Sequence, residues 1–450
     1  NLKVQTARKK LMCDFKLARA AFDREYKGAK RLYQRNKQDR ISQTRTDNPK
    51  SFWNEIRRLG PGTKTNVIPM EVLINGQIVD DLDEVLQHWQ QEYSKLFSDV
   101  GCTDFDDRFL ENAVQLLDEW ENVYSDMLTY NGNGFQPGNH INDCLNTPVT
   151  IDEVKKVLGK MKNGKAVGVD NLPNEILKHN KLLSLLHVLY ARCFECSVIP
   201  DVWKTSVINP IPKKGKEARI PSNNRAISLI STVAKGYTQL LNTRITKYLE
   251  DNNILADEQN GFRKLRSTID HLYTLISILK NRKRRNKATY VCYVDFSRAF
   301  DAIPHSLMKL KLLECGVDGK IYKSICELYR DMRSIVRLNG HLTEPFPITI
   351  GTRQGDNLSP TIFNIYINDL IKEVNNLGLG VEHAGMNVSI LGYADDLVLT
   401  ADSEDDLQMM LNCLHSYCCK WRLSVNANKT QVMHFRKATE PQTSQCFTYG

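Results

Sequence analysis

Two apolar runs, VSILG and LVLTA, flank Tyr393-Ala394-Asp395-Asp396 in the C-terminal part of the chain. Short apolar runs separated by a tight polar turn predict a β-hairpin, which here would carry two adjacent carboxylates at its tip. Because side chains alternate along a strand, only one of the two can point fully toward a shared site. Asp is also common in ordinary turns, and on this feature alone a plain turn is favoured.

A second acidic position changes that balance. Asp295 closes an apolar strand predicted over 289–296, where an ionised carboxylate is costly unless it is solvated, paired or bound to a cation. Mg²⁺ prefers hard oxygen ligands and takes one or two carboxylates together with waters and substrate phosphates. Asp295, Asp395 and Asp396 therefore form a candidate two-metal site for phosphoryl transfer. A separation of 100 residues does not by itself show that they meet.

The chain divides into three predicted segments. A basic helical arm covers 1–46, and an N-terminal extension with an acidic, flexible linker covers 47–148. The extension includes a hairpin at 72–79 and an amphipathic helix after it, and the Gly-, Asn- and Pro-rich stretch at 130–148 marks the main boundary. The body over 149–450 begins with a capping box, and its alternating helices and short apolar strands predict an α/β or α+β catalytic domain.

The arm accounts for the positive charge of the chain. Residues 1–45 carry 14 Lys and Arg against 4 Asp and Glu, while the whole chain has a net charge of +9. Two interpretations remain open, a solvated helix face and an arm that binds nucleic-acid phosphates. A second basic run, Lys280–Arg285, is expected to be a solvated loop, with a nucleic-acid contact or a nuclear-import patch as the alternatives.

No apolar stretch is long enough to cross a bilayer, and no signal peptide is visible, so neither a membrane partner nor secretion is expected. Scattered cysteines fit a reducing compartment, and Cys193 and Cys196 are expected to be core residues rather than zinc ligands. The absence of an initiator Met and the abrupt stop at Gly450 suggest a piece of a longer polypeptide.

Seven segments, in a fixed order, resemble the motifs of reverse transcriptases, and most closely those of non-LTR (LINE-type) retrotransposons. The resemblance covers roughly 150–450 strongly and 1–100 weakly. It implies the fingers and palm of a right-hand polymerase, an α+β fold, preceded by a helical N-terminal extension, with the thumb absent after Gly450. The segments are KNGKAVGVDNLPNEILK (162–178), INPIPKKGKEARIPSNNRAISLISTVAK (208–235), DEQNGFRKLRSTID (257–270), YVDFSRAFDAIPHSLM (293–308), GTRQGDNLSPTIFNIYINDL (351–370), GYADDLVLTA (392–401) and WRLSVNANKTQVMHF (421–435).

The resemblance also implies residue roles. Asp295, Asp395 and Asp396 would bind two Mg²⁺ ions, with Mn²⁺ as the alternative, and the backbone carbonyl of Phe296 would be a further ligand. The substrate contacts it implies are Arg225 on the incoming triphosphate, assisted by Lys213 or Lys214, Gln354 beside the sugar and phosphates, and Lys429 at the leaving pyrophosphate. Ordinary surface charges and a turn residue are the alternatives for Arg225, Lys429 and Gln354.

Phe300 stands five residues after Asp295, where RNA-templated RNA polymerases carry an acid that engages the ribose 2′-hydroxyl. An aromatic ring there would exclude that hydroxyl and select deoxynucleotides. The alternative is a core aromatic at the start of a helix. One departure from the family pattern is Ala226, which replaces the Pro that usually follows Arg225 and makes that turn less rigid.

The implied activity is RNA-directed DNA synthesis, with an RNA template, a DNA primer or target and dNTPs as partners, in the nucleus and cytoplasm. Two alternatives stay open: a catalytically inactive remnant or domesticated nucleic-acid-binding protein, and an enzyme of the group II intron type. The intact carboxylates and Arg225 argue against decay.

Overall fold

The computed structural model describes residues 16–17, 19–28, 31–32, 35–36, 68–98, 105–129, 143–353, 355–439 and 441–450. The chain forms two compact units, Asn1–Val67 and Ile68–Gly450. In the first unit, residues 19–28 of the basic arm are helical and exposed, as predicted. Residues 47–67 of the extension lie outside the described residues, and so does most of the expected linker at 130–148.

The second unit begins with the predicted hairpin, β1 (Val72–Ile74) and β2 (Gln77–Val79), whose turn residues Asn75 and Gly76 both have positive φ. Two successive positive φ values are typical of the tight hairpin turn that Asn-Gly favours. Helix α3 (Leu82–Leu96) follows and buries Val85, Trp89 and Tyr93, in agreement with the predicted stripe.

The extension is more firmly joined to the body than its sequence suggested. Its acid-rich part forms a long helix, α4 (Asp107–Thr129), which lies against α12 (His305–Glu314) and α15 (Glu404–Trp421). Asp107 forms an ion pair with Arg422 at the end of α15. Residues from Ile68 onward therefore belong to one compact unit, whereas the sequence placed its main boundary at 148/149.

One of the two larger sheets of the body is a mixed five-stranded sheet. It contains β3 (Thr205–Pro212), β4 (Asn224–Ile230), β6 (Arg333–Leu338), β7 (His341–Leu342) and β8 (Phe346–Pro347), in the order β4-β3-β6-β7 with β8 also paired to β6. Strands β3 and β4 are antiparallel with Ile211 opposite Arg225. This pairing places Lys213 and Arg225 at the same end of the β3–β4 hairpin.

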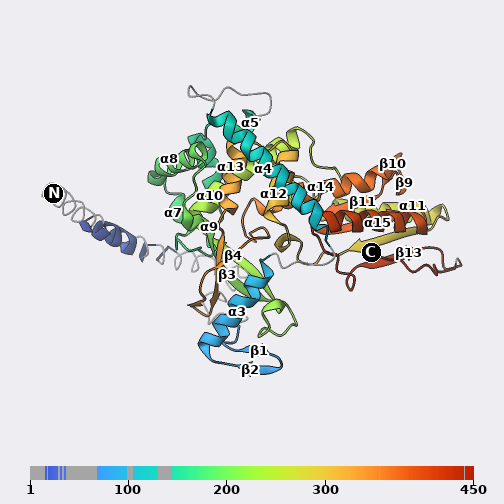
Figure 1. The fold of residues 1–450 in the computed structure, drawn as a ribbon, viewed down its shortest axis with the longest axis horizontal. Coiled ribbons are helices and arrows are strands. Elements are labelled where there is room, and N and C mark those ends of the chain that lie inside the picture. Colours follow the sequence, from blue (N-terminus) through green and yellow to red (C-terminus); the bar gives the residue numbers. More distant parts are fainter. Residues whose placement is uncertain are drawn as a thin grey trace. The chain divides into compact units, whose positions relative to one another are not determined.

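The other is a four-stranded antiparallel sheet in the order β11-β12-β5-β13. Its strands are β5 (Thr289–Val294), β11 (Ile390–Tyr393), β12 (Asp396–Ala401) and β13 (Gln431–Phe435). Strand β5 alternates: Cys292 and Val294 face the main core, while Val291 and Tyr293 pack with α11 (Thr268–Arg284). Figure 1 shows α14 (Ser359–Asn376) and α15 beside this sheet.

The remaining helices build the main core around the two sheets, through α10 against α6, α6 against α8 and α8 against α13. The predicted capping box at Thr150–Glu153 is confirmed at the start of α6. No helix in the described part of the chain combines the length and apolar character needed to cross a bilayer. The other elements are α5 (Asp143–Asn146), α6 (Ile151–Lys160), α7 (Asn174–Leu177), α8 (Asn180–Cys196), α9 (Asp201–Lys204), η1 (Pro221–Asn223), α10 (Thr232–Asp251), η2 (Ala299–Asp301), α13 (Gly319–Tyr329), β9 (Val381–His383) and β10 (Met386–Val388).

The run Lys280–Arg285 is helical and not the expected loop, because it forms the last turn of α11 and its C-cap; most of the run is exposed, as expected. Arg282 is buried, donates a 2.7 Å hydrogen bond to Thr289 Oγ1 and pairs with Asp402. Cations in the last turn also complement the helix dipole, which gives the run a structural role.

Candidate active site

The predicted hairpin is present, and its turn consists of Ala394 and Asp395 alone. Strands β11 and β12 pair from Ile390 opposite Leu399 to Tyr393 opposite Asp396. Ala394 has φ 58°, a left-handed conformation that residues with a side chain rarely adopt. Asp395 is half-buried and Asp396 is exposed, so the two carboxylates have different surroundings, as strand alternation predicted.

The structure brings the third carboxylate to the same place. Strand β5 is antiparallel to β12, with Val294 opposite Leu397. One step further along this register, Asp295 lies opposite Asp396. The 100 residues between Asp295 and Asp395 are therefore bridged by a direct pairing of two strands.

Mutual repulsion is visible in the electrostatics of this group. The pKa of Asp395 is raised, first by burial and then by the negative charges of Asp396 and Asp295, while a backbone hydrogen bond partly opposes the shift. Within the described ranges, no three His, Cys, Asp or Glu side chains form a ready-made metal site. Clustered carboxylates fit Mg²⁺, which completes its shell with waters and substrate phosphates.

The segment at 424–430 holds the end of β5. The backbone N–H of Asp295 donates to Thr430 Oγ1 over 3.3 Å, and the N–H of Asn426 donates to the carbonyl of Asp295 over 2.7 Å. Lys429 Nζ lies 3.1 Å from Asp295 Oδ2, so the lysine singled out in the sequence contacts a member of the carboxylate group. The ring of Phe296 is buried, and the role of its carbonyl stays a prediction.

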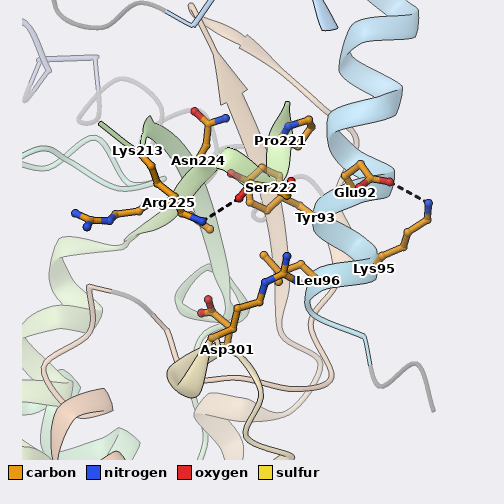
Figure 2. Close-up of a pocket in the computed structure, with 12 residues that line it drawn as sticks. Glu92, Tyr93, Lys95, Leu96, Lys213, Pro221, Ser222, Asn224, Arg225 and Asp301 are labelled. Atoms are coloured by element: carbon orange, nitrogen blue, oxygen red, sulfur yellow. Dashed lines mark hydrogen bonds and ion pairs between the residues drawn. The ribbon is translucent and has the colours of Figure 1, made fainter. Parts of the chain in front are cut away.

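A cavity of about 320 Å³ lies between α3, the β3–β4 hairpin and η2 (Figure 2). Four basic residues line it, Lys95, Lys213, Arg225 and Arg298, together with Glu92, Asp301 and Tyr93. Lys214, the alternative to Lys213 in the sequence, is not among the lining residues.

Positive charge is concentrated at this cavity. The pKa of Lys213 is lowered, first by partial burial and then by the neighbouring charges of Arg298, Lys429 and Arg225. Lys213 Nζ donates a 2.9 Å hydrogen bond to the carbonyl of Ser222, which orients its side chain (Figure 2). A recess lined by several cations raises the local concentration of anions and suits a phosphate chain. The interaction with Lys429 connects it electrostatically to the carboxylates.

Neither Arg298 nor Tyr93 was predicted from the sequence to line a binding cavity. Arg298 has φ 54° at the start of η2, and an Arg in the sequence does not predict such a left-handed conformation. Tyr93 belongs to α3 in the N-terminal extension, so its position beside Asp301 depends on a contact between distant segments. Its pKa is raised, first by burial and then by the charge of Asp301.

Phe300 is half-buried and stacks on Phe363 of α14, with ring centroids 4.4 Å apart. Its carbonyl accepts hydrogen bonds from Thr352 N at 2.7 Å and Thr352 Oγ1 at 3.1 Å. Stacking on Phe363 fixes the ring, and the bonds to Thr352 fix the backbone of Phe300. Both expectations for Phe300, a ring that excludes the ribose 2′-hydroxyl and a core aromatic, are compatible with this arrangement. Gln354, two residues after Thr352, lies outside the described residues.

His305 connects the start of α12 to the segment before Thr352, because its Nε2 donates to the carbonyl of Gly351 over 3.0 Å. Burial lowers the pKa of His305 to about 4, against an ordinary value of 6.5. As pH falls, His305 is protonated in the unfolded chain at a higher pH than in the folded chain. The protein therefore loses stability as pH falls from 6.5 toward 4. We expect His305→Gln, which keeps a donor but does not titrate, to remove roughly 3 kcal/mol of this pH dependence. Urea unfolding at pH 7 and pH 4.5 measures it, and equal pH dependence in both proteins would contradict the assignment.

Known proteins resemble this chain over the same regions. The model of the family described as reverse transcriptase (RNA-dependent DNA polymerase) matches residues 211–449, more than half of the chain. The probable RNA-directed DNA polymerase from transposon BS of Drosophila melanogaster is 27% identical over 294 residues, covering 63% of this chain and 32% of that protein. The RNA-directed DNA polymerase from mobile element jockey of Drosophila funebris is 28% identical over 301 residues, covering 65% and 32%.

A solved structure of apo telomerase from Candida tropicalis, truncated from its C-terminal domain, matches with a TM-score of 0.41 and 14% identity, covering 62% of this chain and 60% of that one. The chain spans about a third of the length of the curated relatives named above. The family match and these relatives agree with the order of motifs in the sequence. The chain belongs to the reverse transcriptase (RNA-dependent DNA polymerase) family, and its relatives are the polymerases of non-LTR retrotransposons.

Proposed function

We propose that the chain transfers deoxynucleotides to the 3′-hydroxyl of a DNA primer on an RNA template, as the polymerase part of a non-LTR retrotransposon protein acting in the nucleus and cytoplasm. The observation that carries the proposal is the meeting of Asp295 with Asp395 and Asp396 at the ends of neighbouring strands. Family membership supplies the reaction class, and this geometry supplies the carboxylates that such a reaction needs.

Asp295, Asp395 and Asp396 would hold two Mg²⁺ ions. Bound there, the ions would activate the 3′-hydroxyl and stabilise the departing pyrophosphate. Family members generally depend on divalent metal. Lys429, which contacts Asp295, would release that contact and neutralise or protonate the pyrophosphate.

The basic cavity would bind the triphosphate of the incoming dNTP. Arg225 offers a planar fork of donors that matches paired phosphate oxygens, and Lys213 adds a point charge beside it. Phe300 would exclude the ribose 2′-hydroxyl, and Gln354 would contact the sugar and phosphates. Different residues would thus bind the triphosphate, select the sugar and position the nucleotide.

The test is extension of a labelled DNA primer annealed to an RNA template, with each dNTP and with Mg²⁺ or EDTA. We expect template-dependent, Mg²⁺-dependent extension by the protein with its native flanking segments. Mn²⁺ should substitute at altered fidelity. Tight binding of primer–template without any extension would favour the alternative of a non-catalytic nucleic-acid-binding protein.

Removal of residues 1–45 should weaken primer–template binding if the basic arm binds phosphates. The slope of log affinity against log salt should then fall by about 0.7–0.9 for each phosphate that the arm had neutralised. Fluorescence anisotropy over a salt series measures both quantities. As a control that keeps the chain length, Arg19, Arg24, Lys27 and Arg31 are changed together to Gln. Unchanged affinity and slope in both variants would leave the arm as a solvated helix.

A further inference from the structure

A short segment of the chain runs beside the hairpin that carries the carboxylates. Gln259 forms an isolated parallel bridge with Gly392 in β11. The N–H of Gly392 donates to the carbonyl of Glu258, and the N–H of Asn260 donates to the carbonyl of Gly392, each over 2.8 Å. His271 Nε2 adds a 2.9 Å hydrogen bond to the same carbonyl. The segment formed by residues 258–261 is thus hydrogen-bonded to the C-terminal end of β11.

The side chain of Gln259 reaches the turn itself. Its Oε1 accepts hydrogen bonds from the N–H groups of Ala394 and Gly261, both at 2.8 Å. Its Nε2 donates to the carbonyl of Ala394 over 3.2 Å. The residue is fully buried, so these bonds are shielded from water. One amide therefore engages both backbone groups of the residue before Asp395.

Two further observations show that the turn needs this support. Ala394 has φ 58°, a conformation for which a tight turn ordinarily uses Gly. The approach of the segment is also close: a Cβ added at Gly261 would lie 2.2 Å from the nitrogen of Ala394. A strained conformation persists where its surroundings over-determine it. Here the buried amide of Gln259 and the glycine at 261 provide those surroundings.

We infer that Gln259 is a positioning residue that fixes the Ala394–Asp395 turn, and through it the carboxylates of Asp395 and Asp396. The inference rests on the proposed function. The side chain of Gln259 bonds to backbone groups of Ala394 and Gly261, so its effect on the carboxylates would be exerted through the turn. Partners that orient metal ligands typically change metal affinity or activity by about 10- to 100-fold when removed.

The test compares Gln259→Met with Asn368→Leu in the protein with its native flanking segments. Met is similar in length but leaves the groups of Ala394 without their partner. Asn368 is a matched control: it is also buried, donates to Ile254 O over 3.0 Å and accepts from Ala256 N over 2.8 Å, but does not contact the turn. Three quantities are measured for each protein: the unfolding midpoint, Mn²⁺ affinity by electron paramagnetic resonance, and kcat and KM for dNTP.

We expect Gln259→Met to weaken Mn²⁺ binding and lower kcat by about tenfold or more, with KM for dNTP changed less than about threefold. Asn368→Leu should lower the unfolding midpoint alone. Adding Ala394→Gly to Gln259→Met should restore part of the loss, because glycine adopts the turn conformation without the amide. A purely structural role would not produce this split between metal affinity, kcat and KM.

If Gln259→Met does not fold, Gln259→Glu has the same shape, keeps the acceptor and loses the donor to Ala394 O when ionised. Its kcat and Mn²⁺ affinity should then decrease as pH rises through the titration of the new carboxyl. Wild-type Mn²⁺ affinity and kcat in a folded Gln259 variant, over that pH range, would overturn the inference. Failure of the wild-type chain to extend primers would instead reject the proposed function, while Mn²⁺ affinity would still test the role of Gln259.

Discussion

Asp295→Asn and Asp395→Asn are each expected to lower primer extension by about a thousandfold or more. Each change removes a charged ligand from the place where the two metal ions would be held. A thousandfold loss corresponds to about 4 kcal/mol of transition-state stabilisation, which is within the several kcal/mol that metal ions supply in phosphoryl transfer. Single-turnover extension at saturating dNTP and primer–template measures the effect.

The matched control is Asp331→Asn, the same chemical change at an exposed position between α13 and β6. Asp331 has φ 51°, and Asn tolerates that conformation well, so folding should not suffer. Primer–template affinity should be nearly unchanged in all three variants. Near-normal extension by either Asp295→Asn or Asp395→Asn, at equal folded concentration, would reject the two-metal assignment.

Phe300→Val is expected to admit ribonucleotides while leaving deoxynucleotide incorporation largely intact. The ring would exclude the 2′-hydroxyl by contact alone, so a smaller side chain removes the penalty without changing a metal ligand. Exclusion of one small group is worth about 1–3 kcal/mol, so the preference for dNTP over rNTP should fall by about tenfold or more. The measurement is kcat/KM for a matched dNTP and rNTP in both proteins.

Phe300 also packs on Phe363, so the effect of weaker packing must be separated from the effect of weaker exclusion. Phe363→Leu disturbs the same stacked pair from the other side and serves as the control. It should lower the unfolding midpoint but leave the dNTP preference in place. If Phe300→Val leaves the preference unchanged, Phe300 is a core residue and sugar selection occurs elsewhere.

Local features were predictable from the sequence because short-range physics determines them. The hairpin turns at Asn75-Gly76 and Ala394-Asp395 and the cap at Thr150 follow from residue types a few positions apart. The meeting of Asp295 with Asp395 was not available from spacing, since it depends on pairing β5 with β12. Resemblance to a family supplied that expectation, and the strand register now supplies its geometry.

The remaining differences arise from tertiary contacts. The basic run at Lys280–Arg285 looked solvated, but Arg282 finds a buried hydroxyl and a carboxylate on other elements. Gln259 lay within a recognised motif, yet nothing in its neighbours indicated that its amide would reach Ala394, 135 residues away. Patterns in one sequence predict the buried faces of helices and strands and the positions of turns. They do not predict which polar group a buried side-chain amide will contact.

The strand order β11-β12-β5-β13 also has a consequence for biosynthesis. Strand β5 is made early, but its two neighbours, β12 and β13, end only at Ala401 and Phe435. At about 5–20 residues per second, the 101 residues from Asp295 to Asp396 take roughly 5–20 s to translate. During that interval a nascent chain already contains the β3–β4 hairpin and its cations, while Asp295 lacks the carboxylates it will meet. The carboxylate group is therefore completed late in synthesis, well after the strands that carry Lys213 and Arg225.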